Sequence, residues 1–246
     1  MRAGALGPVA LLALWEVLGR TVFAASRVVP PPSAILSHMA DDGFSFYWSN
    51  SVTTLREAGA GWLYGNAVAL VLAIAFVQIP LLERALLQLA LASYCLPVIA
   101  IGPVLAVLFG GDTPKVILAA LSVIFTTLIS TLVGLRGADR TSLDLVRAYG
   151  GGSWTQLRRV RLRAALPGLF AGLRIAAPAA MLGAIIGEYL GAESGLGVAM
   201  INSQQSLAVE RTWGIALVAT ALSGVAYGIT ALAGRLLTPW APRIAR

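Results

Sequence analysis

The sequence predicts an all-α membrane protein with six transmembrane helices and with both termini on the cytoplasmic side. Of the 246 residues, 58% are hydrophobic and only 12% are charged, which is about half the charged share of a soluble domain. Six apolar stretches are long enough to cross a bilayer, since a helix needs about 20 residues to span a hydrocarbon core of about 30 Å. This composition excludes a soluble globule and a disordered chain.

The six predicted spans follow one another along a single transmembrane domain, residues 1–246. They cover about 6–23, 58–80, 86–109, 114–135, 166–190 and 212–236. The first contains Glu16 and Arg20, which are four residues apart and can pair on one helix face. A cleaved signal peptide is the alternative for this segment, but Glu16 interrupts the apolar run that such a peptide needs.

A polar connection is predicted from Ala24 to about Arg56, between the first and second spans.

Proline and glycine residues predict breaks and packing faces within the spans. In the third span, Pro97 and Pro103 predict a kink or a break. In the fifth span, glycines recur every four residues and predict a face for close helix packing, of the kind found at the centre of a dimer. These glycines are Gly183, Gly187 and Gly191.

The distribution of basic residues predicts the orientation. With the N-terminus inside, the inside segments hold twelve arginines and the outside segments hold four basic residues. The opposite orientation reverses these numbers, so the positive-inside rule places both termini in the cytoplasm. The net charge of +7 is then mainly a topology signal, and no nucleic-acid partner is expected.

The longest cytoplasmic segment is the loop 136–165 between spans 4 and 5. Ser142 is predicted to cap a short helix, 143–149, which the glycines at 150–152 then end. Ser153 begins a capping box before a second, basic helix that runs towards Pro167. The geometry alone leaves two interpretations open: an amphipathic loop on anionic lipid, or a loop that docks a protein partner.

The same loop carries a family resemblance. The segment Asp144-Leu145-Val146-Arg147-Ala148-Tyr149-Gly150, followed by Val160, Leu162 and Pro167, resembles the cytoplasmic loop of permease subunits of binding-protein-dependent ABC importers. That pattern has an acidic residue with a glycine six positions later. The sequence departs from it in having aspartate for glutamate at the acidic position, two bulkier residues for two alanines, and Arg163 for a proline.

Further motifs resemble the nitrate, sulfonate, taurine and bicarbonate branch of that family. They are Trp15-Glu16, Pro31-Pro32-Ser33, Leu96-Pro97, Ile101-Gly102-Pro103, Leu108-Phe109-Gly110, Gly187-Glu188-Tyr189-Leu190-Gly191-Ala192 and Ser194-Gly195-Leu196-Gly197. The resemblance therefore covers nearly the whole chain.

The resemblance implies a multi-pass permease subunit in a bacterial plasma (inner) membrane. It implies a second permease copy in a homodimer, two cytoplasmic ATP-binding subunits and an external substrate-binding protein. The short helix with its glycine would then couple to the ATPase. The implied coupling residues are Asp144, Leu145, Val146, Arg147, Ala148, Tyr149 and Gly150.

The chain itself agrees with ATP hydrolysis on a partner. A phosphate-binding P-loop needs a lysine after a glycine, but the only lysine, Lys115, lies between Pro114 and Val116. With one histidine and one cysteine, no zinc-type His/Cys ligand set is possible. We therefore expect no enzyme and no cofactor on this chain, with ATP and Mg on the partner ATPase.

The solute path is less determined by sequence. Candidates are Tyr94, Thr127, Ser130 and Glu188, because polar groups within spans line paths as well as join helices. The family branch implies a small anion, such as a sulfonate, nitrate or bicarbonate, or a small heterocycle such as a vitamin precursor. Two other functions stay open: a standalone channel or secondary transporter, and an ABC permease of another substrate branch.

Overall fold

The computed structural model describes residues 3–25, 28–95 and 97–241, without the side chains of residues 3–6 and 89–95. Within these ranges the regular elements are all helical. In chain order they are α1 (Ala3–Arg20), α2 (Pro32–Asp42), α3 (Phe44–Gln78), α4 (Pro80–Cys95), α5 (Val98–Leu108), α6 (Thr113–Arg136), α7 (Arg140–Ala148), α8 (Ser153–Gln156), η1 (Leu157–Arg161), α9 (Leu162–Glu188), α10 (Leu196–Gln205) and α11 (Val209–Leu237).

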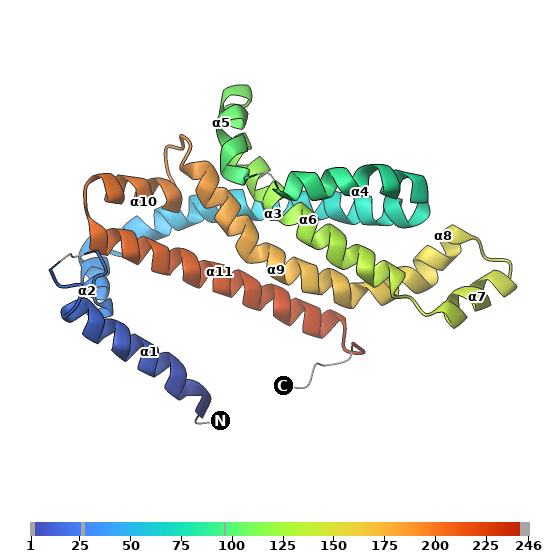
Figure 1. Cartoon of the computed structure of the whole chain (residues 1–246), viewed down its shortest axis with the longest axis horizontal. Coiled ribbons are helices and arrows are strands. Elements are labelled where there is room, and N and C mark those ends of the chain that lie inside the picture. Colours follow the sequence, from blue (N-terminus) through green and yellow to red (C-terminus); the bar gives the residue numbers. More distant parts are fainter. Residues whose placement is uncertain (1–2, 26–27, 96, 242–246) are drawn as a thin grey trace.

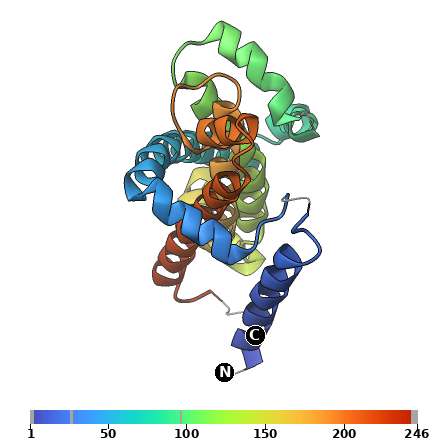
Figure 2. The same cartoon turned by 90° about the vertical axis from the view of Figure 1, so that its left-hand side faces the viewer.

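Long helices form the centre of the molecule (Figure 1). Helix α6 packs against both α3 and α9, and α11 packs against α9. Helices α7 and α8 lie at one end of this bundle, whereas α2 and α10 lie at the other end (Figure 1). Helix α10 packs on α9 and α11, and α1 contacts α2. Seen from the α2 end, α1 and α5 project on different sides of the bundle (Figure 2).

Four helical segments in the described residues are long and apolar enough to cross a membrane. They are 44–78, 113–136, 153–188 and 209–237. They contain the fourth and sixth predicted spans and all but the last two residues of the second and fifth. The third predicted span is divided between α4 and α5, because Pro97 precedes the first residue of α5. The predicted break is therefore confirmed at Pro97, whereas Pro103 lies inside α5.

The predicted polar connection before the second span is mostly helical. It contains α2, and α3 already begins at Phe44. With 35 residues, α3 is about 52 Å long at 1.5 Å per residue, which exceeds the thickness of the hydrocarbon core. The aromatic start of α3 is ordered because Tyr47 and Phe46 pack with Leu196 of α10 and Ile215 of α11.

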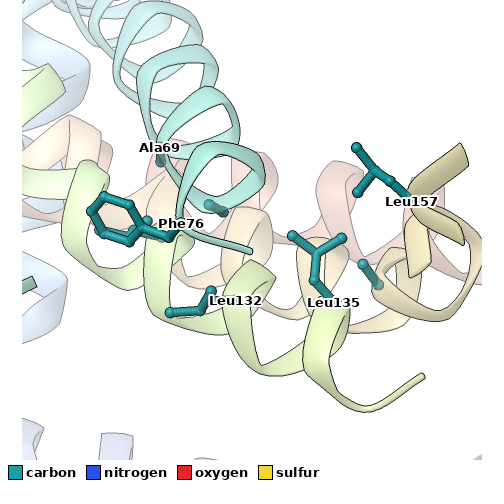
Figure 3. Close-up of a cluster of buried hydrophobic side chains, with 8 residues drawn as sticks. Ala69, Phe76, Leu132, Leu135 and Leu157 are labelled. Carbon is teal, nitrogen blue, oxygen red and sulfur yellow. The ribbon is translucent and has the colours of Figure 1, made fainter. Parts of the chain in front are cut away.

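The main apolar cluster joins α3, α6 and the beginning of the α8–α9 helix (Figure 3). Phe76 of α3, Leu132 and Leu135 of α6, and Leu157 of η1 are buried there. The small side chains of α3 in this cluster let the helices approach closely. This end of the bundle therefore holds the base of α7 in a fixed position.

Two of the three predicted packing glycines lie against α6. A Cβ atom at Gly183 would come within 2.8 Å of the Cα atom of Ala119, and one at Gly187 within 2.7 Å of the Cα atom of Lys115. Gly191 differs from the prediction. It lies beyond the end of α9 with a φ of 123° and open space around its Cα, so it forms a turn instead of a packing face.

Candidate functional site

The short helix α7 begins three residues earlier than predicted, at Arg140. Its N-cap is Asp139, not Ser142, because the Asp139 carboxylate accepts the backbone N–H of Ser142 at 2.8 Å and its hydroxyl at 2.9 Å. These hydrogen bonds, led by the one from the backbone, hold the pKa of Asp139 below its usual range. The cap fixes the start of α7 one turn after α6 ends.

The end of α7 is set by a glycine, as predicted. The helix ends at Ala148, and Gly150 follows with a φ of 76°, a left-handed conformation that favours glycine. The N–H of Gly150 donates to the carbonyl of Arg147, and the N–H of Gly151 donates to that of Val146, both at 2.8 Å. These bonds satisfy carbonyls that the helix end would leave open.

The segment after the glycines differs from the predicted separate helix. Helices α8, η1 and α9 run on as one helical segment, 153–188, with a π-helical stretch at η1. Gly152 occupies the N-cap position and no side chain caps this helix start, so the predicted capping box at Ser153 is wrong. Instead, Gln156 donates to the carbonyl of Leu143 at 3.1 Å, which ties α7 to this segment.

One face of α7 is exposed and mixes apolar and charged groups. Leu145 is 58% exposed and Tyr149 is 86% exposed. Asp144 and Arg147 pair across 3.3 Å on the same short helix. We name these four residues the α7 surface. On the other face, Leu143 is buried, so α7 is anchored by one side and free on the other.

A buried polar cluster lies at the opposite end of α9. The carboxylate of Glu188 is 1% exposed and accepts the hydroxyl of Thr54 at 2.6 Å and the backbone N–H of Gly197. The hydroxyl of Thr54 in turn accepts the N–H of Leu196 at 2.9 Å. Glu188 thus joins α3 to the first turn of α10, an arrangement that sequence reasoning did not foresee.

A second carboxylate and the only lysine complete this cluster. The ammonium group of Lys115 lies 3.2 Å from Glu57 and 2.8 Å from Asp112. The side chain of Glu57 is 3% exposed and that of Lys115 is 8% exposed. Buried charges need partners, and this pair holds the start of α6 against α3. In the sequence, Glu57 and Lys115 each lie at an end of a predicted span. This position is the signal from which the pair could have been suspected.

The predicted path residues lie in different environments. Thr127 is fully buried, and its hydroxyl donates to Asn66 of α3 at 2.5 Å, so it joins two helices. Ser130 is half-buried and packs beside Gly172 of α9. The side chain of Tyr94 falls outside the described residues. The three candidates with described side chains, Thr127, Ser130 and Glu188, are therefore not gathered around one cavity.

The arrangement defines a class of protein: a helical membrane protein that crosses the bilayer several times and presents a short helix at one end. Among the described side chains, no group of three residues is placed to hold a metal ion. The polar side chains described above join helices to one another. The two candidate functional features are the α7 surface and the buried cluster.

Comparison with known proteins identifies the family. Residues 65–241 match the binding-protein-dependent transport system inner membrane component. The chain therefore belongs to that family of ABC importer permeases. Such a permease is a non-enzymatic membrane component, and ATP hydrolysis occurs in partner subunits.

Several curated proteins and a solved structure are similar to the chain. The riboflavin transport system permease protein RibX of Chloroflexus aurantiacus is 33% identical over 234 residues, which cover 94% of this chain and 87% of that protein. The formylaminopyrimidine transport permease protein ThiX of Halalkalibacterium halodurans is 30% identical, with coverage of 76% and 75%. The taurine transport system permease protein TauC of Escherichia coli is 25% identical, with coverage of 94% and 86%.

The fold is also shared with a solved transporter. A structure described as inward facing conformations of the MetNI methionine ABC transporter matches with a TM-score of 0.60 and 19% identity. The match covers 79% of this chain and 95% of that one. At this identity the likeness concerns the fold.

Proposed function

We propose that this chain forms the solute path of an ATP-driven importer and couples to a separate ATPase subunit through α7. The observation that carries the proposal is the α7 surface, because its exposed Leu145 and Tyr149 have no contact that would keep them from water in the described chain. Exposed apolar side chains gathered on one face typically mark an interaction site.

The coupling contact is proposed for seven consecutive residues. Apolar contact with a groove of the ATPase comes from Leu145, Val146 and Tyr149, and polar contact at the rim comes from Asp144 and Arg147. Ala148 lets the backbone approach closely, and Gly150 sets the direction of the chain. Because Leu143 and Gln156 anchor α7 to the α8–α9 helix, a movement of the ATPase would move that span as a rigid body.

The family supports a proposal for the assembly. We propose a single domain of six spans, with α1 and the α4–α5 segment supplying the other two, and both termini in the cytoplasm of a bacterial cell. Two copies of the permease would join two ATPase subunits, which bind ATP and Mg, and one external binding protein. The basic residues near α7 support this orientation, since cytoplasmic segments are rich in arginine.

The solute is proposed to be small. The named solutes of similar permeases are riboflavin, a formylaminopyrimidine and taurine. They include a sulfonate and two heterocycles. These relatives support the branch that the sequence motifs indicate.

Co-purification tests the coupling. The tagged permease is co-expressed with its ATPase subunit, and the amount of ATPase retained in detergent is measured. The double variant Leu145→Asp, Tyr149→Asp places two charges in the proposed apolar contact and is expected to lose at least nine-tenths of the bound ATPase. The control Leu207→Asp changes a residue that is 83% exposed between α10 and α11, and it is expected to retain the ATPase. Equal retention by both variants would contradict the proposal.

A further inference from the structure

One charged residue lies in the central parts of the four long helices. Residues 58–78, 116–135 and 212–234 contain no Asp, Glu, Lys or Arg, and residues 164–187 contain only Arg174. Arg174 lies well inside the continuous helix 153–188. An ionisable residue at such a position is a functional-site hypothesis by default.

Arg174 faces α11 and has no anionic partner among the described residues. Its guanidinium carbon lies 5.8 Å from the centre of the Tyr227 ring, where α9 and α11 run side by side (Figure 1). Its Nε atom is buried and donates to no acceptor in the described part of the chain. The guanidinium carbon lies over the tyrosine ring at a cation–π distance, and no carboxylate among the described residues accepts its N–H groups.

The depth of Arg174 excludes a simple interfacial role. It lies fourteen residues before Glu188 and eleven residues after Arg163, which correspond to about 21 Å and about 17 Å along a helix. Both distances exceed half of a hydrocarbon core of about 30 Å. Arginine side chains reach headgroups from the ends of spans, but Arg174 is near the middle.

The central parts of the four long helices contain no carboxylate. All eleven acidic residues lie outside the central parts of the four long helices. Of these, Glu16 is in α1, but it already binds Arg20 at 2.5 Å and the hydroxyl of Ser33 at 2.6 Å. A second copy has the same helices, so it also offers no carboxylate from their central parts. The central parts of the long helices, in this copy and in a second one, therefore supply no counter-anion for Arg174.

We propose that Arg174 and Tyr227 form a binding site for the oxyanion group of the transported solute, such as a sulfonate or a carboxylate. A guanidinium binds such groups through two parallel N–H donors, and the Tyr227 ring holds its plane in place. The inference rests on the proposed function and deepens it, since it selects an anionic solute over a neutral heterocycle. It makes Arg174 a solute-contacting residue within the path.

Thiol modification tests the site without knowledge of the solute. In a Cys95→Ala background, Ser223→Cys places a single thiol on α11 one turn from Tyr227. The full-length permease in nanodiscs is treated with a sulfonate-bearing methanethiosulfonate reagent or with a trimethylammonium-bearing one, and both rates are divided by those of free glutathione. The anionic reagent is expected to react about tenfold faster, because a positive charge lies near the thiol.

Two substitutions and two lipid compositions test whether the preference for the anionic reagent comes from Arg174. Arg174→Gln is expected to remove the preference, whereas the matched variant Arg235→Gln, at the far end of α11, keeps it. Nanodiscs of phosphatidylcholine and of phosphatidylglycerol should give the same preference, while a preference that disappears in phosphatidylglycerol would assign the site to a lipid headgroup and overturn the proposal. Equal rates for the two reagents, or no reaction of Ser223→Cys while Tyr149→Cys reacts, would also overturn it. The assay needs no ATPase, so its failure is separate from a failure of coupling.

Discussion

The Glu188 carboxylate illustrates how single residues organise this protein. It lies at the last position of α9, yet its partners are a hydroxyl of α3 and a backbone N–H of α10. A carboxylate near a helix N-terminus also interacts favourably with the helix dipole. Its described contacts therefore hold helices together at the end of the bundle that we assign to the outside.

Removal of this carboxylate should destabilise the fold. Glu188→Ala leaves the N–H of Gly197 without its acceptor in a buried place, while the hydroxyl of Thr54 keeps the carbonyl of Asn50 as an acceptor at 3.2 Å. One buried unsatisfied group costs about 1–3 kcal/mol, so the free energy of unfolding should fall by about 1–3 kcal/mol. Thermal unfolding in detergent measures the change. Glu193→Ala, at an exposed position, is the control and should have no effect; an unchanged Glu188→Ala variant would contradict the assigned contacts.

The contacts of Asp42, at the same end of the bundle, predict that the stability of the fold depends on pH. The Arg211 guanidinium and the Tyr47 hydroxyl each donate to the carboxylate of Asp42 at 2.9 Å. These hydrogen bonds, first from Arg211 and then from Tyr47, hold the pKa of Asp42 below its usual range. A carboxyl group with a lowered native pKa stabilises the fold fully above its unfolded pKa of about 3.9, and this contribution disappears as the pH falls through the native pKa.

Asp42→Asn should therefore lower the thermal midpoint at pH 7 and should flatten its decrease between about pH 5 and pH 3. Asp41→Asn, at the exposed neighbouring position, is the matched control and should behave like the parent protein. A parent midpoint that rises on acidification through this range would argue against the assigned role of Asp42.

At the scale of elements, α7 and its flanking turns are the part with the clearest division of roles. One face is anchored by Leu143 and Gln156, the other face is exposed, and two turns fix the ends. The turn at Gly150 requires a positive φ, while Gly152 has a φ of −80° and a ψ of −175°, which other residues adopt readily.

This difference gives a matched pair of variants. Gly150→Val forces a β-branched residue into a left-handed conformation, at a cost of about 1–2 kcal/mol, and should displace the end of α7. Solute-stimulated ATP hydrolysis by the reconstituted importer should fall at least tenfold with little change in helix content. Gly152→Val adds a side chain to open space in a compatible conformation and should keep the activity. Similar activities in the two variants would contradict the role of the turn.

The elements also show what could be predicted from sequence. The length of the apolar stretches predicted the four long helices, and Gly150 predicted the end of α7. Both features could be predicted because they depend on local chemistry. The predicted start of α7 was wrong because Asp139 and Ser142 are both good capping residues and only the backbone geometry decides between them. The partners of Glu188 were missed because Thr54 and Gly197 come close only after α3, α9 and α10 pack.

At the scale of the whole molecule, the two ends of the bundle differ in kind. One end carries α7 (Figure 1) and the seven arginines of residues 136–163. The other end carries the buried cluster and α10. This asymmetry matches a permease that meets an ATPase on one side of the membrane and a binding protein on the other. The proposed orientation is therefore testable without transport.

Labelling from one side of the membrane checks this orientation. In a Cys95→Ala background, Leu207→Cys should react with a membrane-impermeant maleimide in intact spheroplasts, because Leu207 is exposed in the turn before α11. Tyr149→Cys should react only after lysis. The reverse pattern would overturn the assignment of both termini to the cytoplasm.

The most direct test of the central claim is cross-linking from α7 to the ATPase subunit. Tyr149→Cys in the Cys95→Ala background is treated with a short bifunctional maleimide in membranes that contain the ATPase subunit with one engineered surface cysteine along its groove. A permease–ATPase adduct is expected from Tyr149→Cys and none from Leu207→Cys. Absence of the adduct at every groove position, in a complex that still hydrolyses ATP in response to solute, would contradict coupling through α7.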